Sequence, residues 1–127
     1  MSAVSILFIH GVREHIARHI ASFTPWGFDT KILKGDTAVT EQIEAARSAD
    51  FLIVYAAPLA DEVLRAAQGA RLVQLLAVGY DSMDLPLMRE LDIPCANNGG
   101  ANSRAVADQA VLLMLALYRR LLVAVES

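Results

Sequence analysis

The sequence predicts an α/β fold built on a doubly wound parallel sheet of five strands, with a long helix at the carboxyl end. Apolar runs of strand length alternate five times with segments of helical periodicity along the 127 residues. Such alternation is typical of parallel sheets joined by right-handed crossovers, with helices on both faces. The length suits one domain, and 55% apolar with 20% charged residues is a globular composition.

The first half of the chain supplies three of these strands. The apolar run at residues 4–9 suits a buried strand, whereas residues 28–33 are polar enough for an edge strand. Residues 51–56, FLIVYA, form the most hydrophobic strand and are therefore expected near the centre of the sheet. The helices expected between these strands are residues 12–23 and a segment opened by Thr37 or Thr40 that runs through Ser48.

The second half adds two strands, at residues 72–77 and 93–97, and three helices. Gly69 is placed to end a helix at residues 62–68, and Asp84 to cap one at residues 85–91. The third helix is the long apolar segment at the carboxyl end, which Asn102 or Ser103 can cap.

These elements favour the strand order 2-1-3-4-5, the flavodoxin-like arrangement. We expect a single domain over residues 1–127, with its core in residues 1–101 and the long helix over residues 102–125.

Charge and composition exclude several classes of function. A net charge of −3 provides no basic surface, so no nucleic-acid partner is expected. The amino terminus lacks the features of a signal peptide, and the near-uncharged run at residues 109–118 is too short to cross a membrane, so a cytoplasmic location is expected. No metal site is expected. The single cysteine, Cys95, lies in an apolar strand and is expected to be a buried, inert thiol.

The loops that follow residues 72–77 and 93–97 indicate a ligand edge. In a parallel sheet the ligand crevice is formed by loops at the carboxyl ends of the strands. Gly79 lets the first of these loops turn tightly and brings amide N–H groups close to whatever occupies it. Because unpaired N–H groups carry partial positive charge, this loop favours small anions.

Three segments, AVGYDSMDL, DIPCANN and GANSRAVADQAVLLMLALYRR, follow one another through this region. In order and register they resemble the D-isomer-specific 2-hydroxyacid dehydrogenases, an NAD(P)-dependent family that includes phosphoglycerate, glyoxylate and formate dehydrogenases. Residues 1–71 agree with the first domain of that family only in the rhythm of strands and helices.

The resemblance implies roles for five residues. The main-chain amides of Val78 and Gly79 would hold the carboxylate of a 2-keto or 2-hydroxy acid, and Ala57 and Pro58 would line the pocket for its side chain. Asn102 would lie near substrate and nicotinamide, or else serve only as a helix cap. Val106 matches a cofactor-contacting position, although a valine there suits a helix core equally well.

The resemblance also implies what the chain does not carry. The catalytic histidine, the substrate-binding arginine and its acidic partner belong to later segments of the family, and His10, His15 and His19 occupy none of these positions. The 127 residues contain no G-x-G-x-x-G spacing. We therefore expect no catalytic residue here and no tight binding of NAD or NADP to this chain alone. Where the family usually has a proline, this sequence has NGG at residues 98–100, which predicts a more mobile loop.

The leading interpretation is the substrate-binding domain of an NAD(P)-dependent oxidoreductase acting on 2-hydroxy acids, inactive as this chain alone. Its last helix is apolar almost all round over residues 106–125, so we expect a homodimer or other self-association through it. The alternative is a stand-alone, non-catalytic flavodoxin-like scaffold that associates through the same helix. Versions that bind flavin or accept a phosphoryl group are disfavoured. A flavin site needs a hydroxyl-rich phosphate loop after the first strand, which residues 11–14 do not supply; a phospho-receiver needs acidic residues directly after the first strand, where His10 and Gly11 stand, and an aspartate after the third, which residues 55–58 lack.

Overall fold

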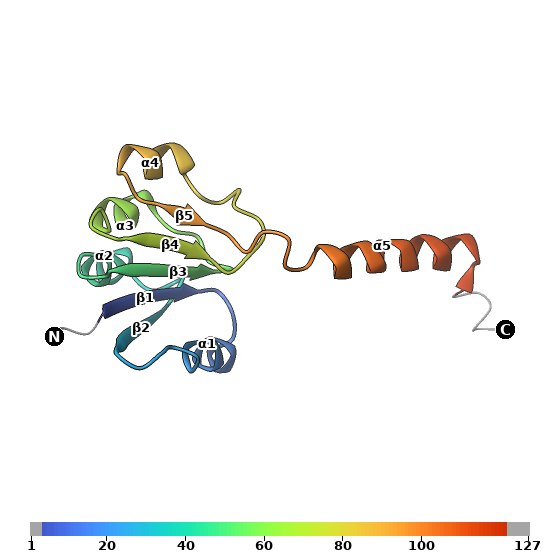
Figure 1. Ribbon diagram of the computed structural model, residues 1–127, viewed down its shortest axis with the longest axis horizontal. Coiled ribbons are helices and arrows are strands. Elements are labelled where there is room, and N and C mark those ends of the chain that lie inside the picture. Colours follow the sequence, from blue (N-terminus) through green and yellow to red (C-terminus); the bar gives the residue numbers. More distant parts are fainter. Residues whose placement is uncertain (1–3, 122–127) are drawn as a thin grey trace.

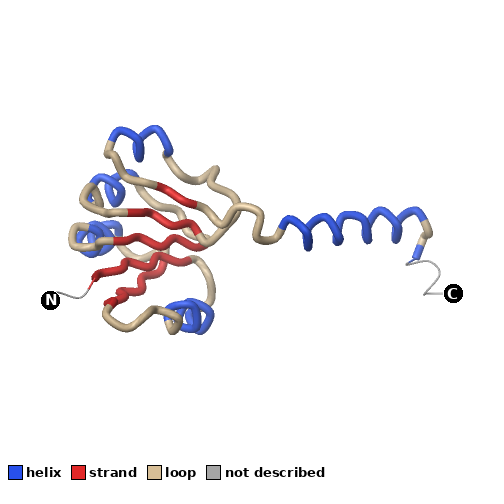
Figure 2. Tube along the Cα trace, viewed as in Figure 1, coloured by secondary structure: helices blue, strands red, loops and turns tan. Residues whose placement is uncertain are grey.

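The computed structural model describes residues 4–121 and contains a five-stranded parallel sheet in the order β2-β1-β3-β4-β5. This confirms the predicted fold class and strand order. The strands are β1 (Val4–His10), β2 (Phe28–Lys34), β3 (Phe51–Tyr55), β4 (Leu72–Leu75) and β5 (Cys95–Ala96). The helices are α1 (Glu14–Ala21), α2 (Val39–Ala46), α3 (Asp61–Ala66), α4 (Leu85–Glu90) and α5 (Ser103–Tyr118). As predicted, β3 is the central strand and β2 lies at an edge (Figure 2).

The three longest strands end level with one another. His10, the last residue of β1, pairs with Lys34 at the end of β2 and with Tyr55 at the end of β3. The loops that follow these strands therefore leave the sheet side by side, at the edge where ligands bind in folds of this class.

One face of the sheet forms the main core with α2 and α3. Alternate residues of the inner strands point to this face and are at most 4% exposed. They are Leu7, Ile9, Leu52, Val54, Val73 and Leu75. Two fully buried residues of α3, Val63 and Leu64, belong to the same cluster. Burial of each such side chain contributes about 2 kcal/mol, so this layer provides most of the stability of the domain.

The opposite face is only partly covered. Phe8 and His10 are buried there, and the His10 ring reaches α1, since its Nε2 lies 3.7 Å from a carboxylate oxygen of Glu14. Farther along the same face, five partly exposed apolar side chains surround a shallow hollow of about 210 Å³. They are Ile6, Phe28, Phe51, Ile53 and Leu72.

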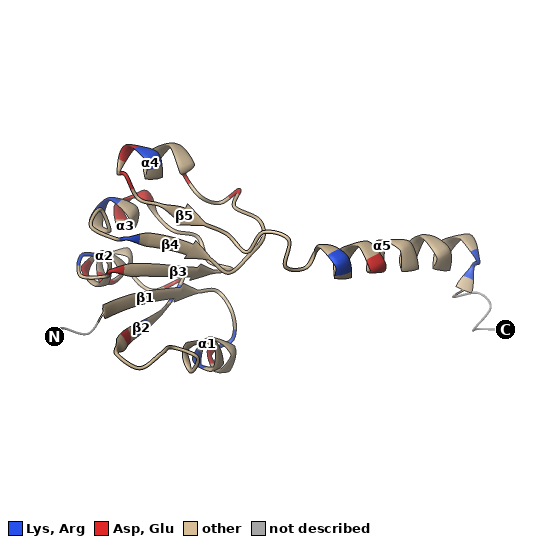
Figure 3. Ribbon diagram, in the orientation of Figure 1, with Lys and Arg blue, Asp and Glu red and all other residues tan. Residues whose placement is uncertain are grey.

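Helix α5 extends away from the sheet, and none of its residues is buried (Figure 1). Its middle turns carry no charge; Arg104 and Asp108 lie near its start, and Arg119 and Arg120 follow its end (Figure 3). The predicted helix reached residue 125, but α5 ends at Tyr118 and Arg120 has a left-handed backbone with φ 49°. The rest of the predicted helix, residues 122–125, lies outside the described residues. No helix within residues 4–121 is long and apolar enough to cross a membrane.

Helix caps agree with the sequence at one position and differ at others. Asp84 caps α4 as predicted, since its Oδ1 accepts a hydrogen bond of 2.8 Å from the N–H of Leu87. Neither Thr37 nor Thr40 caps α2, which begins after Ala38 without a side-chain cap. Asn102 occupies the cap position of α5, but its side chain makes no capping hydrogen bond.

The expected burial of Cys95 is wrong, because its side chain is exposed. Strand β5 is an edge strand of only two residues that pairs with β4 alone, so no strand within residues 4–121 covers its outer side. Partial desolvation still raises the pKa of the Cys95 thiol, which keeps it protonated at neutral pH.

Candidate functional site

The loop after β4 presents two neighbouring unpaired amides. The backbone N–H groups of Val78 and Gly79 donate no hydrogen bond to any residue from 4 to 121. The carbonyl groups of this loop, in contrast, are paired with the loop after β5. The Ala77 oxygen accepts a bond of 3.0 Å from the N–H of Asn98, and the Val78 oxygen accepts one of 2.6 Å from Asn97 Nδ2.

The carbonyl and N–H groups of this loop therefore have different partners. Its carbonyl dipoles are bound to the neighbouring loop, whereas its N–H dipoles are left for another partner. A carboxylate is such a partner, because its oxygens accept two charge-assisted hydrogen bonds from adjacent N–H groups. The loop that sequence analysis selected therefore has the chemistry expected of a small-anion site.

The reason given for Gly79 is wrong in one respect. The turn does not require glycine, because the φ angle of Gly79 lies outside the left-handed region. A Cβ atom added there would meet only Asp81 Oδ2, at 3.4 Å. A glycine is therefore not required for this turn, and an added Cβ would have room at this position.

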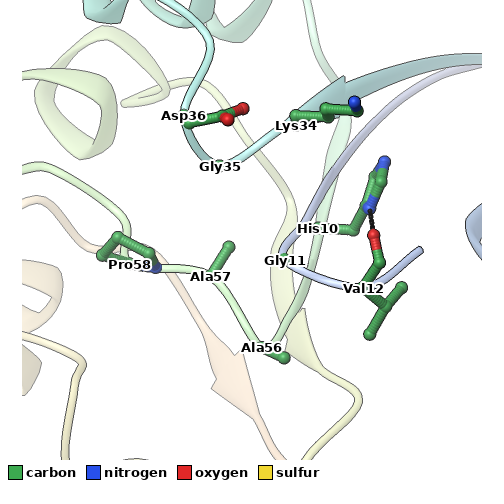
Figure 4. A pocket seen from close by; sticks show the side chains of 9 residues that line it. All are labelled: His10, Gly11, Val12, Lys34, Gly35, Asp36, Ala56, Ala57 and Pro58. Atoms are coloured by element: carbon green, nitrogen blue, oxygen red, sulfur yellow. Dashed lines mark hydrogen bonds between the residues drawn. The ribbon is translucent and has the colours of Figure 1, made fainter. Parts of the chain in front are cut away.

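Ala57 and Pro58 line a cavity of about 460 Å³ at the ends of β1, β2 and β3 (Figure 4). The structure thus places both residues just after β3, at the carboxyl end of the sheet. It also adds neighbours that sequence analysis did not select. The remaining lining residues are His10, Gly11, Val12, Lys34, Gly35, Asp36 and Ala56.

Close contacts of Gly11 and Gly35 shape this cavity. A Cβ atom on Gly11 would lie 1.9 Å from the carbonyl oxygen of Ala56, and one on Gly35 would lie 2.8 Å from the Cβ of Ala57. Ala56 has a left-handed backbone with φ 53°, which is strained for a residue with a side chain. The sequence signal for this site was a glycine placed directly after each of the first two strands.

His10 has a structural role beside the cavity. Its Nδ1 lies 3.0 Å from the carbonyl oxygen of Val12, which can only accept, so Nδ1 carries the proton. The ring is 1% exposed and packs against Phe8 at a centroid distance of 5.7 Å. Its Nε2 has no hydrogen-bond partner in the described part of the chain. The other two histidines, His15 and His19, lie exposed on α1.

The other two candidate residues are Asn102, at the cap position of α5, and Val106 in its first turns, whose N–H donates to the Asn102 oxygen at 2.9 Å. No side-chain hydrogen bond of Asn102 to a described residue is present, and Val106 is 58% exposed. The interpretation of Val106 as a core residue is therefore wrong. Within residues 4–121, no group of three or more His, Cys, Asp or Glu side chains is arranged to hold a metal ion.

Comparisons with known proteins identify the family of the chain. Residues 6–125 match the family model of the D-isomer specific 2-hydroxyacid dehydrogenase catalytic domain. The chain is 29% identical over 98 residues to a glyoxylate reductase of Thermococcus onnurineus, covering 75% of this chain and 29% of that protein. It is 33% identical over 89 residues to an erythronate-4-phosphate dehydrogenase of Shewanella baltica, covering 69% of this chain and 23% of that protein.

Solved structures share the fold at low sequence identity. A 2-hydroxyacid dehydrogenase from Ketogulonicigenium vulgare superposes with a TM-score of 0.76 at 20% identity, over 98% of this chain and 38% of that one. The NAD⁺-bound 3-phosphoglycerate dehydrogenase of Entamoeba histolytica gives a TM-score of 0.70 at 20% identity, over 90% of this chain and 39% of that one. The chain spans 23% to 29% of the length of the curated relatives that it matches.

Proposed function

We propose that this chain, which belongs to the D-isomer specific 2-hydroxyacid dehydrogenase family, supplies the substrate-binding part of an enzyme that interconverts 2-hydroxy and 2-keto acids. The observation that carries the proposal is the pair of unpaired amides at Val78 and Gly79. They bind the carboxylate of the substrate and thereby orient its C2 carbon. Ala57 and Pro58 follow β3 and line a cavity, which leaves room for the substituent on C2.

The residues of this chain bind and orient rather than transfer protons. The His10 ring is buried and its Nδ1 is engaged by the Val12 carbonyl, so we assign it no acid–base role. When bound, NAD or NADP supplies or accepts the hydride. No phosphate-binding glycine motif occurs in the 127 residues, so we place the dinucleotide on another part of the enzyme. The proposal therefore includes no turnover by this chain alone, and it keeps the cytoplasmic location expected from the sequence.

Helix α5 supports a second element of the proposal, a homodimer. Eight large apolar side chains of α5 are between 54% and 83% exposed. They are Val106, Val111, Leu112, Leu113, Met114, Leu115, Leu117 and Tyr118. An exposed apolar surface of this extent usually marks a protein contact. It equally favours the alternative of a self-associating scaffold without catalysis, so ligand binding has to separate the two.

A glycolate titration followed by amide-resolved NMR tests the carboxylate site. The expected result is that glycolate shifts the Val78 and Gly79 resonances, whereas the uncharged analogue glycolamide does not. Gly79→Pro, which removes one N–H donor, should abolish the shifts. Gly79→Ala is the matched control, because its Cβ has space and its N–H remains.

Circular dichroism establishes that each Gly79 variant is folded before it is titrated. Retention of glycolate binding by folded Gly79→Pro would refute the role of this amide. Absence of any glycolate response in the unaltered chain would instead favour the scaffold alternative.

A further inference from the structure

The sheet face opposite the main core, called the open face below, is not covered by any described residue over β3 and β4. Residues paired in a parallel sheet point to the same side. Those on the open face of β1, β3 and β4 are Ile6, Phe8, His10, Phe51, Ile53, Tyr55, Leu72 and Gln74. None of them is Asp, Glu, Lys or Arg, and all five from β3 and β4 are only partly buried. Because parallel sheets are normally covered by helices on both faces, this composition is typical of a surface that a helix covers.

Helix α5 is the second uncovered apolar surface of the chain. Each of the other four helices has at least one buried residue, whereas α5 has none. The stretch from Gln109 to Tyr118 carries no charge. With 16 residues α5 spans about 24 Å, which matches the roughly 23 Å spanned by the seven residues of β1. The one helix without a cover therefore has the length and the composition to cover the open face.

The segment that leads into α5 directs this helix away from its own sheet (Figure 1). The N–H of Asn98 donates to the Ala77 oxygen at 3.0 Å, and the N–H of Ala101 donates to the Asn98 oxygen at 3.3 Å. The N–H of Ser103 donates to the oxygen of Gly100, whose φ is 77°. Folding α5 back onto its own sheet would break these bonds, whereas the α5 of a second copy can reach the open face with the bonds intact. Exchange of one element between identical chains is a common route to dimers.

We infer that the open face binds helix α5 of a second copy of this chain, and that the exchange is reciprocal about a twofold axis. The uncharged stretch of the partner helix lies over Ile53 and over the hollow lined by Phe28, Phe51 and Leu72. A helix of this length on a sheet buries on the order of 400 Å² of each surface, so two such contacts reach the roughly 1,600 Å² of a standard interface. The inference rests on the homodimer of the proposed function and identifies the surface that α5 contacts.

A charge placed in the open face tests this contact on the 127-residue chain. Ile53→Lys should raise the dissociation constant of the dimer at least about 100-fold, as measured by light scattering over a range of concentrations, because the partner helix would bury an unpaired charge. Val39→Lys is the matched control, since Val39 is an apolar side chain, 43% exposed, on α2 in the opposite layer. That variant should dimerise like the unaltered chain. Circular dichroism establishes that both variants are folded.

Crosslinking tests the same contact without a charge in the sheet. All chains carry Cys95→Ser, so the introduced cysteine is the only thiol. Chains with Ile53→Cys are mixed with ¹⁵N-labelled chains that carry either Leu113→Cys or Leu115→Cys, positions on opposite sides of α5. A flexible bismaleimide should link the two kinds of chain, and mass spectrometry identifies the mixed dimer. Glu62→Cys, on α3 in the opposite layer, replaces Ile53→Cys in the control and should give no mixed dimer.

The outcomes separate this inference from the proposed function. Unweakened dimers of folded Ile53→Lys, or crosslinks between two α5 helices and none to Ile53→Cys, would overturn docking on the open face but keep the homodimer. Crosslinking within one chain that carries both thiols would show that α5 covers its own sheet and would overturn the second copy as its occupant. A monomeric unaltered chain would overturn both the docking and the homodimer. The carboxylate site is tested separately, because glycolate should still shift the Val78 and Gly79 amides in Ile53→Lys.

Discussion

Replacement of Gly11 by alanine tests the backbone contact that shapes the cavity. The added Cβ would lie 1.9 Å from the Ala56 carbonyl oxygen and 2.9 Å from its carbon. Both are backbone atoms, so no side-chain rotation can relieve the overlap, and one loop must move. The contact is also anchored at Gly11 itself, whose N–H donates to the Tyr55 oxygen at 2.9 Å.

The cost of the replacement can be estimated from these two effects. Overpacking with backbone displacement costs about 1–3 kcal/mol, and loss of the Gly11 hydrogen bond costs about 1 kcal/mol more. We therefore expect Gly11→Ala to lower the free energy of unfolding by roughly 2–4 kcal/mol, a large part of the roughly 5–15 kcal/mol typical of a domain. For a domain of this size the melting temperature should fall by roughly 10 °C.

Urea unfolding followed by circular dichroism measures this change. Gly69→Ala is the matched control, because a Cβ there meets nothing within 4 Å and its φ is not left-handed. That variant should be neutral or more stable by roughly 0.5 kcal/mol, since alanine restricts the unfolded chain. A loss below about 0.5 kcal/mol in Gly11→Ala would refute the close approach of the loops after β1 and β3.

Three further predictions concern other parts of the molecule. Hydrogen bonds from Ser5, its backbone N–H at 2.8 Å and its hydroxyl at 3.1 Å, lower the pKa of Asp50. This contribution to the free energy of unfolding is present above the unfolded-state pKa of about 4 and is lost as the pH falls through the lower folded-state pKa. When the free energy of unfolding is measured against pH, Asp50→Asn should therefore flatten its decrease between about pH 2 and 5. Ser5→Ala, which keeps the backbone bond, should flatten it only in part, and an unchanged profile in Asp50→Asn would contradict this assignment. Cys95 should react with a thiol reagent in the folded protein, because its side chain is exposed. The rate should rise with pH as the thiolate forms, and the rise should come at a higher pH than for an ordinary thiol because desolvation raises the pKa of Cys95; reaction only after addition of urea would show that the thiol is buried. The double variant Leu113→Lys with Leu117→Lys should convert the associated chain to a monomer, as measured by light scattering. Trp26→Lys, at a fully exposed position outside α5, should leave the association unchanged. An unchanged mass in the α5 variant would exclude this helix as the contact.

Sequence reasoning succeeded where the cause of a structure is local. The apolar runs predicted the strands because a strand covered on both faces needs apolar side chains in succession. Asp84 was identified as a cap because its carboxylate reaches an amide three residues away, at 2.8 Å in the structure. The loop at Val78 and Gly79 was found in the same way, from a glycine that follows an apolar strand.

Other features depend on partners that are distant along the chain. The exposure of Cys95 follows from the position of β5 at the edge of the sheet, not from the apolar residues around it. Helix α5 has the composition of a buried helix, yet within residues 4–121 nothing covers it. Apolar composition predicts that a surface will be buried against a partner but does not identify the partner.

By itself, the sequence determined the fold class, the strand order and the loop that presents free amides, because these follow from periodicity and from short-range backbone chemistry. Only the tertiary structure shows that Gly11 and Gly35 lie in close contact with Ala56 and Ala57, and that Lys34 lines the same cavity. Those contacts join residues more than 20 positions apart and occur because β1, β2 and β3 end level in one sheet. Hydrophobic patterning cannot encode them, since they involve glycine backbones, the Ala57 Cβ and an exposed lysine.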